Sequence, residues 1–322
     1  MRRRKFISLI AAATTWPLAA RGEQMPVIGR LSPVPPPGAP PMNAALGRGL
    51  AEEGYVEGKN LAIEKRFTNF RPELMNGAAG DLVRLEVKAI FADTPEAIAA
   101  AKNATSSIPI VGVDLESDPL AMGYIKSLAR PGGNLTGMFL DLPELSGKQV
   151  GLLKEIVPRL SRIAIFGIPS LNAAQFAAAT AAVRAVGVEA EVIEVHSPTD
   201  WGRALEAAKT KQVQAGILLS SPLVFIHSKQ IGELALANRL PLISLFTEFP
   251  KAGGLIAYGP NLAAMFQKAG AYVGKILHGA RPNDLPIQRP EKFDLVINLK
   301  AAGALGLSIP SVLLTTADDV IE

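Results

Sequence analysis

The sequence predicts an α/β protein made of two doubly wound, Rossmann-like lobes that are joined by a multi-strand hinge. Short apolar runs rich in Val and Ile alternate with longer stretches whose apolar residues recur at helical spacing. This alternation occurs twice in tandem. The chain of 322 residues also exceeds the size at which a single core stops growing. Because strands that alternate with helices form parallel sheets covered on both faces, each series predicts one lobe.

The first series begins after residue 25 and ends near residue 113. Its predicted strands are Val27–Ser32, Leu61–Phe67, Val87–Phe91 and Ile108–Val113. The helices between them are predicted at Met42–Glu53, Pro72–Leu85 and Pro95–Ala104. Gly54 is the usual left-handed stop after the first helix, and Pro95 stands in a first helical turn, where a missing N–H costs nothing.

The second series begins with an extended segment and an amphipathic helix that Pro158 ends. Those two elements are predicted at Leu135–Leu140 and Leu145–Val157. The strands that follow are predicted at Arg162–Phe166, Glu189–Val195, Ala215–Leu219 and Leu242–Leu245. The helices that alternate with them are predicted at Ala173–Val186, Trp201–Lys209 and Ile226–Asn238.

The last part of the chain is too short for a third domain and must return to the two existing sheets. It is predicted to contain Leu255–Tyr258 as a strand, Leu262–His278 as a helix, Phe293–Ile297 as a strand and Leu299–Leu305 as a helix. We expect an N-terminal lobe of residues 25–139 plus about 259–292, and a C-terminal lobe of 140–258 plus about 293–322. Three crossings between lobes would then form a hinge, which is the geometry of closure around a ligand.

Residues 1–24 have the pattern of a signal peptide. Four basic residues, Arg2 to Lys5, precede an apolar run from Phe6 to Ala20 that is too short to span a membrane. The paired arginines before Lys5, Phe6 and Ile7 are typical of twin-arginine export. A disordered basic tail is the alternative, but such tails lack the apolar block. The pattern predicts a periplasmic protein.

The charge balance argues against nucleic acid as a partner. Residues 1–24 hold five of the 33 basic and one of the 29 acidic residues, so 28 of each remain in the mature chain. A domain without net charge has no bulk electrostatic attraction to phosphate backbones or anionic lipid. There is no cysteine to carry a lipid anchor or a disulfide, and no later run of 18 apolar residues. We therefore expect no stable membrane insertion after processing.

Catalytic motifs are sparse, so we expect a protein that is not an enzyme and needs no cofactor or metal. The three histidines, His196, His227 and His278, lack metal-ligand spacing. The segment Gly54–Lys59 imitates a phosphate loop but has too few residues between its glycines. Gly47 and Gly49 lack the third glycine of a dinucleotide fingerprint and fall inside a predicted helix rather than at its start.

Several segments together resemble the substrate-binding proteins of ABC transporters, of the type I periplasmic binding fold and related to tryptophan- and tyrosine-binding proteins. The segments are Leu50–Asn60, Ile108–Val111, Ser127–Gly137, Ala252–Leu255, Tyr258–Pro260 and Lys292–Asn298. The resemblance covers nearly the whole chain. It implies a two-lobed fold, an extracytoplasmic location, a small-molecule ligand, and a permease with its ATPase as partners. The loops at Ala92–Pro95 and Phe246–Phe249 depart from the family pattern, so pocket chemistry is expected to differ.

In the first lobe the ligand should meet the carboxyl ends of the strands. Hydroxyls and free N–H groups at helix starts suit a carboxylate. Glu116 and its acidic neighbours on either side could instead hold an ammonium or cap the helix near Pro119. Capping is the favoured role of Asp118, and Asp114, directly after an apolar strand, is the better candidate of the two for ligand contact. The candidates in this lobe are Ser32, Asp93, Thr94, Asp114 and Asp118.

In the second lobe each candidate has a structural role that competes with ligand contact. Asn172 could cap the helix that follows it, and Ser220 and Ser221 could only form a turn with the next proline. Phe246 offers a flat wall for a ring or a core contact, and Tyr258 lies beside a crossing where it could pack in the hinge. The candidates in this lobe are Asn172, Ser220, Ser221, Phe246, Glu248 and Tyr258.

These observations favour capture of a small organic solute, with an amino acid or an aromatic acid preferred, for delivery to an ABC importer. A sensor or regulator of the same fold is one alternative, but a DNA-linked regulator would begin with a helix-turn-helix rather than an export signal. An α/β enzyme is the other alternative, and turnover by the purified protein would reveal it.

Overall fold

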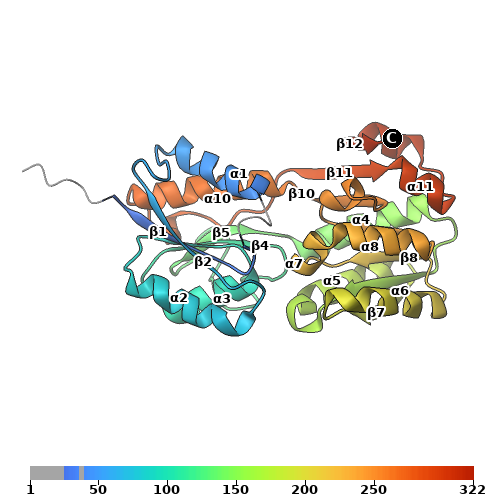
Figure 1. The fold of residues 1–322 in the computed structure, drawn as a ribbon, viewed down its shortest axis with the longest axis horizontal. Coiled ribbons are helices and arrows are strands. Elements are labelled where there is room, and N and C mark those ends of the chain that lie inside the picture. The colour runs from blue at the N-terminus through green and yellow to red at the C-terminus, as the bar shows by residue number, and fades with distance from the viewer. Residues whose placement is uncertain (1–24, 36–39) are drawn as a thin grey trace, which may run out of the picture.

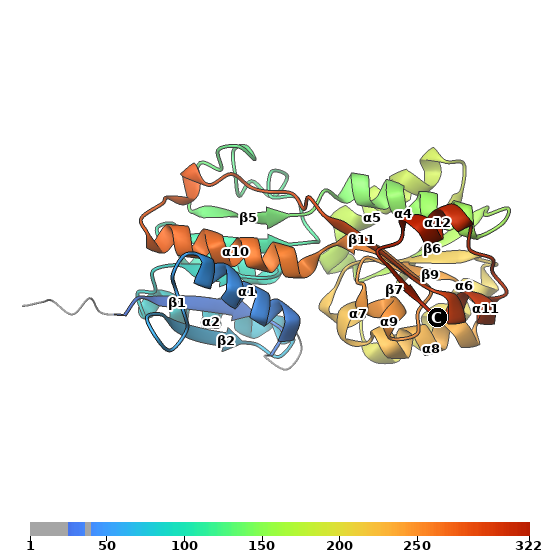
Figure 2. The ribbon, with the colours of Figure 1, turned by 90° about the horizontal axis from the view of Figure 1, so that it is seen from above.

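The computed structural model describes residues 25–35 and 40–322, and they form two lobes, each built on its own sheet (Figures 1 and 2). This confirms the predicted class, an α/β protein with two doubly wound lobes. The predicted signal peptide lies outside the described residues. Within the two described ranges, no helix combines the length and the apolar composition that crossing a membrane requires.

The first sheet has five parallel strands in the order β2-β1-β3-β4-β5. They are β1 (Val27–Ser32), β2 (Ala62–Phe67), β3 (Ile90–Ala92), β4 (Ile110–Asp114) and β5 (Leu135–Phe139). Its helices are α1 (Pro40–Glu52), α2 (Met75–Arg84), α3 (Pro95–Ala104) and α10 (Leu262–Leu277). Figure 1 shows α1 and α10 together on one face of the sheet, and α2 and α3 on the other.

The alternation of side chains along the strands explains these two layers. On β4, Val111 packs into the cluster that includes residues of α1 and α10, and the adjacent Ile110 packs into the cluster on the α2 and α3 side. Such strands are buried on both faces, which is why they read as continuous apolar runs.

The second sheet has seven strands in the order β12-β11-β10-β9-β8-β6-β7. They are β6 (Arg162–Gly167), β7 (Glu189–Glu194), β8 (Ala215–Leu218), β9 (Leu242–Ser244), β10 (Ile256–Pro260), β11 (Phe293–Asn298) and β12 (Asp319–Ile321). Neighbouring strands are parallel except for β10 and β11, which are antiparallel. Its helices are α4 (Leu142–Ile156), α5 (Pro169–Ala185), α6 (Trp201–Thr210), α7 (Pro222–Ile226), α8 (Ser228–Ala237), α9 (Glu248–Lys251), α11 (Leu299–Leu305) and α12 (Ser311–Thr316).

In the described part of the chain, three segments pass between the lobes. One joins β5 to α4, the second joins β10 to α10, and the third leads from α10 back to β11 (Figure 2). On its way the third segment runs beside β5, where the Gln288 N–H donates to the Gly137 carbonyl and the Phe139 N–H donates to the Gln288 carbonyl. The two lobes are therefore held together by three strand-like connections.

Several elements differ from the sequence prediction. The helix predicted at Ile226–Asn238 is α8, which begins at Ser228, and the separate short helix α7 before it, capped by Ser221, was not predicted. The helix predicted from Ala173 begins at Pro169, and Asn172 forms a kink in its first turn. The short helix α12 and strand β12 were not predicted; β12 has three residues, none of them buried, so it carries no apolar pattern.

Candidate ligand site between the lobes

A cavity lies between the lobes, at the carboxyl ends of strands from both sheets. Its volume is about 660 Å³ when the space at its mouth is counted. The first lobe contributes residues that follow β1, β3 and β4 and residues near the starts of α1 and α10, and the second lobe contributes residues that follow β8 and β9. The lining consists of Arg30, Val34, Pro35, Met42, Asn43, Asp93, Thr94, Val113, Leu115, Glu116, Ser221, Pro222, Phe225, Phe246, Leu262 and Phe266.

A buried ion pair stands at the wall of this cavity in the first lobe. Arg30 Nη2 lies 3.4 Å from Asp93 Oδ2, and the two side chains are only 8% and 7% exposed. The guanidinium also lies over the rings of Phe67 and Phe91, at 5.6 and 5.9 Å from their centroids. Burial raises the pKa of Asp93, against the effect of the Arg30 charge. Arg30 Nε and Asp93 Oδ1 have no hydrogen-bond partner among the described residues.

Two hydroxyl groups face the cavity from opposite lobes at the starts of helices. Thr94 Oγ1 accepts a hydrogen bond from the Ala97 N–H at 3.3 Å, and Ser221 Oγ accepts one from the Val224 N–H at 3.2 Å. In both cases the next residue is a proline at the first helical position, as expected for a helix start. Each hydroxyl keeps its own proton, so both can donate to a ligand acceptor.

Glu116 brings a buried carboxyl to the cavity from the loop after β4. One of its oxygens accepts a hydrogen bond from the Leu115 N–H at 3.3 Å, and the other accepts one from Ser220 Oγ of the second lobe. Burial, and then the nearby charge of Asp114, raises the pKa of Glu116 to about 8. The pKa of Asp114 is itself raised to about 6, chiefly by burial.

A second hydrogen bond between the lobes lies beside the first. Gln175 Nε2, on α5, donates to the Leu115 carbonyl at 2.7 Å. Asn172 Nδ2 donates both to Gln175 Oε1 at 2.8 Å and to the Ser220 carbonyl at 2.6 Å. These groups form one buried polar network that includes Glu116 and joins the two lobes behind the cavity.

Aromatic side chains from both lobes complete the lining. Phe225 and Phe246 of the second lobe pack edge to face, with their ring centroids 5.1 Å apart. Phe266, on α10, lies opposite in the first lobe and packs on Phe91 at 5.5 Å. An apolar ring of a ligand would find aromatic partners on both sides.

Four of the residues predicted from the sequence line this cavity: Asp93, Thr94, Ser221 and Phe246. Others lie directly behind it, bonded to lining residues or to each other. Ser32 Oγ accepts a hydrogen bond from the Val34 N–H, and Asp114 accepts from the N–H groups of Glu116 and Ser117. Asn172 and Ser220 belong to the polar network described above.

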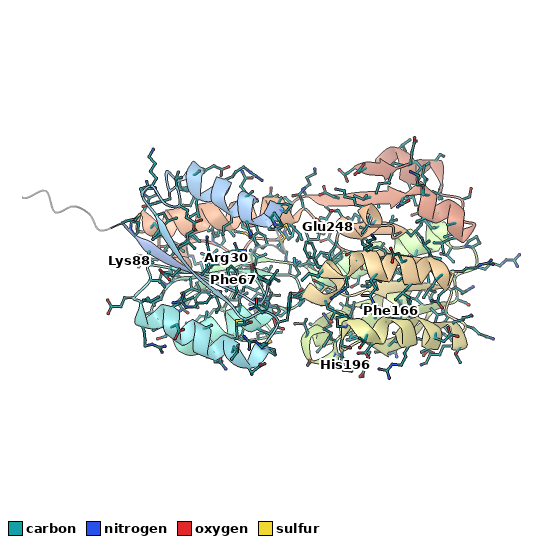
Figure 3. The ribbon with its side chains drawn as sticks, in the orientation of Figure 1. Arg30, Phe67, Lys88, Phe166, His196 and Glu248 are labelled. Carbon is teal, nitrogen blue, oxygen red and sulfur yellow. The ribbon has the colours of Figure 1, made fainter. Side chains whose placement is uncertain are left out.

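The remaining predicted residues are not part of the cavity wall. Asp118 is exposed and caps the next turn by accepting from the Leu120 N–H at 2.8 Å. Glu248 is the first residue of the short helix α9 and is half-buried (Figure 3). Tyr258 lies on β10 and stacks on Phe293 of β11, with ring centroids 5.6 Å apart. Asp118 thus caps a turn rather than the predicted helix, and Tyr258 packs near the crossings, which is the alternative role considered for it.

Sequence reasoning did not select several of the lining residues. Arg30 carried the clearest signal, because it is a charged residue inside the apolar run that predicts β1. Glu116 was considered with its acidic neighbours but was not chosen. Phe266 falls on a predicted helix, where an aromatic residue most often belongs to the core, and Phe225 directly precedes one.

The histidines do not contribute to this cavity. His196 and His227 line a second crevice between the lobes, which shares Pro222 with the cavity. His278 Nε2 lies 2.8 Å from the Glu53 carbonyl at the surface of the first lobe. Among the residues that the structure describes, no three His, Cys, Asp or Glu side chains are grouped so that they could hold a metal ion.

Comparison with known proteins identifies the family. Residues 31–321 match the sequence profile of the family described as ABC transporter substrate binding protein. The chain belongs to this family. Substrate-binding proteins of ABC transporters bind small ligands outside the cytoplasm and work with a transporter.

Individual relatives agree with this family in sequence and in fold. A tyrosine-binding protein of Clostridioides difficile is 24% identical to this substrate-binding protein over 281 residues, which are 84% of this chain and 79% of the relative. The crystal structure of an ABC domain in complex with L-Trp from Streptococcus pneumoniae has a TM-score of 0.84 at 24% identity, covering 92% of this chain and all of the other. A conserved domain protein from Vibrio cholerae has a TM-score of 0.85 with the same identity and coverage. These structures share the type I periplasmic binding fold predicted from the sequence.

Proposed function

We propose that this protein captures a small organic solute, with an amino acid or an aromatic acid favoured, in the cavity between its lobes and delivers it to an ABC importer. The observation that supports this most directly is the lining itself. It combines a buried carboxyl, hydroxyl donors and aromatic rings, and these groups come from both lobes. The permease would receive the solute, and its ATPase would drive the transport.

The chemistry of the lining matches the two charged groups and the ring of an aromatic amino acid. The Thr94 and Ser221 hydroxyls, at helix starts on opposite lobes, would donate to the carboxylate. Glu116 would receive the ammonium, because the raised pKa of this buried carboxyl reflects the lack of a compensating cation. Phe246 and its aromatic neighbours would hold the ring. The relatives named for tyrosine and solved with L-Trp support this class of ligand.

Closure of the lobes would produce the enclosed site. The three connections between the lobes would act as the hinge, and contacts to the ligand from both sides would favour the closed arrangement. In this proposal the N-terminal lobe comprises residues 25–139 plus about 259–292, and the C-terminal lobe comprises 140–258 plus about 293–322. Export by the twin-arginine route, directed by residues 1–24, would place the protein in the periplasm.

A thermal-shift screen of the mature protein against amino acids, aromatic acids and sugars tests the proposal. A ligand at a hundredfold its dissociation constant stabilises the folded state by about 2.7 kcal/mol. Hits should be confirmed by isothermal titration calorimetry with the wild type, with Thr94→Val, which removes a lining hydroxyl, and with Glu248→Gln, which changes a glutamate outside the cavity. We expect one-to-one binding that Thr94→Val weakens and Glu248→Gln does not. Equal affinity in all three proteins would contradict the proposed site, and chemical turnover of a bound solute would favour an enzyme instead.

A further inference from the structure

A second cavity lies inside the first lobe, between α1 and the strands β1 and β2. Its volume is about 800 Å³ when its mouth is counted. Its wall includes the apolar and aromatic side chains of Leu46 and Leu50 on α1, Ile63 and Phe67 on β2, and Tyr55. We call it the α1 cavity. No residue of the second lobe lines it, so it is complete in the first lobe alone.

Arg30 is the charged residue at the inner end of the α1 cavity, and it lines the cavity between the lobes as well. Two of the residues that contact its guanidinium each line a different cavity. Asp93 lies beside the Nη2 end of the guanidinium and lines only the cavity between the lobes. Phe67 lies under the guanidinium and lines only the α1 cavity. Arg30 therefore stands in the wall that the two cavities share.

The hydrogen-bonding capacity of Arg30 is only partly used. Its side chain is 8% exposed, and its single ion pair is long, at 3.4 Å. Nε is buried and has no hydrogen-bond partner among the described residues. A buried guanidinium N–H without a partner costs free energy, and a planar anion such as a carboxylate satisfies it with good geometry.

The rest of the α1 cavity specifies the body of the ligand. Its wall is apolar and aromatic near Arg30, which suits a flat ring. The other charged residues of the wall, Lys65 and Glu57, form an ion pair of 2.6 Å with each other, and both are largely exposed. The α1 cavity therefore suits a ligand that has one anionic group, placed at Arg30, and an apolar body.

We propose that the α1 cavity is a second small-molecule site, which binds an aromatic carboxylate with its carboxylate at the guanidinium of Arg30 and its ring between α1 and β2. This site is separate from the cavity that the proposed function uses, although the two share Arg30 and Asn43.

A substitution at Gly47 can fill the α1 cavity without changing the cavity between the lobes. Gly47 lies on α1, it lines the α1 cavity, and an added Cβ would meet nothing within 4 Å. Gly47→Leu would project a side chain at the cavity, and leucine is a better helix former than glycine. Gly77, on α2, is a matched control, since it is exposed, has the same free space and lines neither cavity.

The experiment measures binding of 4-fluorophenylacetate to the mature protein by ¹⁹F NMR, with 4-fluorophenylacetamide as the neutral counterpart. We expect the carboxylate to bind at least about tenfold more tightly than the amide, because its contact with the guanidinium is charge-assisted. Gly47→Leu and Arg30→Gln should each weaken binding of 4-fluorophenylacetate by about tenfold or more. Gly77→Leu and Phe246→Ala, which changes only the cavity between the lobes, should leave it unchanged.

Three results would overturn the proposal. The first is no binding of 4-fluorophenylacetate to the wild type, and the second is equal binding of the acid and the amide. The third is binding that Phe246→Ala abolishes and Gly47→Leu leaves intact, which would place the probe between the lobes and leave the proposed function standing. Should Arg30→Gln fail to fold, as judged by circular dichroism, the Gly47→Leu and Gly77→Leu pair still decides the outcome.

Discussion

Glu116 in the first lobe accepts a hydrogen bond from the hydroxyl of Ser220 in the second lobe. The bond is buried, and it joins the tip of β4 to the tip of β8. The charged groups that act on Glu116 are also acidic, namely Asp114 and, more weakly, Glu96. The hydrogen bond from Ser220 lowers the pKa of Glu116, but burial and these two acidic neighbours outweigh it, so Glu116 is mostly uncharged at neutral pH.

This arrangement predicts a pH-dependent stability that depends on Glu116. The pKa of Glu116 is raised to about 8 in the folded protein, from 4.5 in the unfolded chain. Between these two pH values the folded state binds more protons than the unfolded chain. The contribution of Glu116 to the free energy of unfolding is therefore fully present below pH 4.5 and is lost as the pH rises toward 8. Asp114 acts in the same direction, but only up to a pKa of about 6. Glu116→Gln should remove the decline between pH 6 and pH 8.

Melting temperatures of the ligand-free protein, measured by circular dichroism from pH 5 to pH 9, check this prediction. The wild type should lose several degrees across the range, at about 2–4 °C per kcal/mol for a domain of this size. Glu248→Gln is the control, because Glu248 lies outside the network. An unchanged slope in Glu116→Gln would mean that this carboxyl is ionised in the folded state.

The neighbouring hydrogen bond, from Gln175 to the Leu115 carbonyl, also joins the lobes, so we expect its removal to change how the lobes are arranged. Gln175→Met keeps the volume of the side chain but leaves the buried carbonyl without its 2.7 Å donor. Loss of a partner for a buried group costs about 1–3 kcal/mol. We expect the variant to favour separated lobes and to show a larger radius of gyration in small-angle X-ray scattering.

Gln230→Met is the matched control for this experiment, since Gln230 is exposed and makes only a 3.4 Å contact to Pro198. Its scattering profile should match that of the wild type. If Gln175→Met gave the same profile too, the hydrogen bond would not contribute to holding the lobes together.

The sequence contained enough information to place the strand tips, because local signals mark them. Thr94 and Ser221 each stand between an apolar strand and a proline, and both cap helices at the cavity as that pattern indicates. The same reasoning led to Asp118, but an exposed aspartate before a proline caps a turn just as well. A single sequence cannot show which of these tips faces the other lobe.

The rest of the site depends on contacts between distant segments. Arg30 and Asp93 are 63 residues apart, and Glu116 and Ser220 are 104 apart, so no local spacing links them. Phe266 reaches the cavity because α10 returns to the first lobe after the chain has built most of the second. Tyr258 lies at a predicted strand tip, but Phe293 of the antiparallel strand β11 covers its ring.

The aromatic lining predicts how ligand affinity responds to truncation. Phe246→Ala removes a ring of the second lobe that also supports Phe225, and Phe266→Ala removes one of the first lobe. Each substitution should weaken the affinity for the solute identified in the thermal-shift screen by about tenfold or more, since buried aromatic side chains contribute most of the binding energy. Phe70→Ala is the control, because that ring is 46% exposed and lies at the second crevice. Calorimetry in which only one lobe's phenylalanine mattered would contradict closure of both lobes on the ring.

The crossing of α1 and α10 predicts a strong requirement for two glycines. A Cβ on Gly49 would lie 1.8 Å from the Gln267 carbonyl oxygen, and one on Gly270 would lie 2.3 Å from the Leu46 carbonyl oxygen. In both cases the obstacle is backbone, which cannot move aside as a flexible side chain can. Gly49→Ala and Gly270→Ala should each therefore destabilise the protein by about 3 kcal/mol or more, at the upper end of overpacking effects.

Gly47→Ala on the same helix separates this steric effect from helix propensity. Its added methyl group meets nothing within 4 Å, so alanine should stabilise the protein by up to about 1 kcal/mol. Urea unfolding of the three variants gives the comparison directly. Because α10 packs beside α1 on the first sheet while its own ends connect to the second lobe, the Gly49 and Gly270 variants should also lose ligand binding at temperatures where the Gly47 variant retains it. Equal midpoints for all three variants would show that the two helices can move apart without cost.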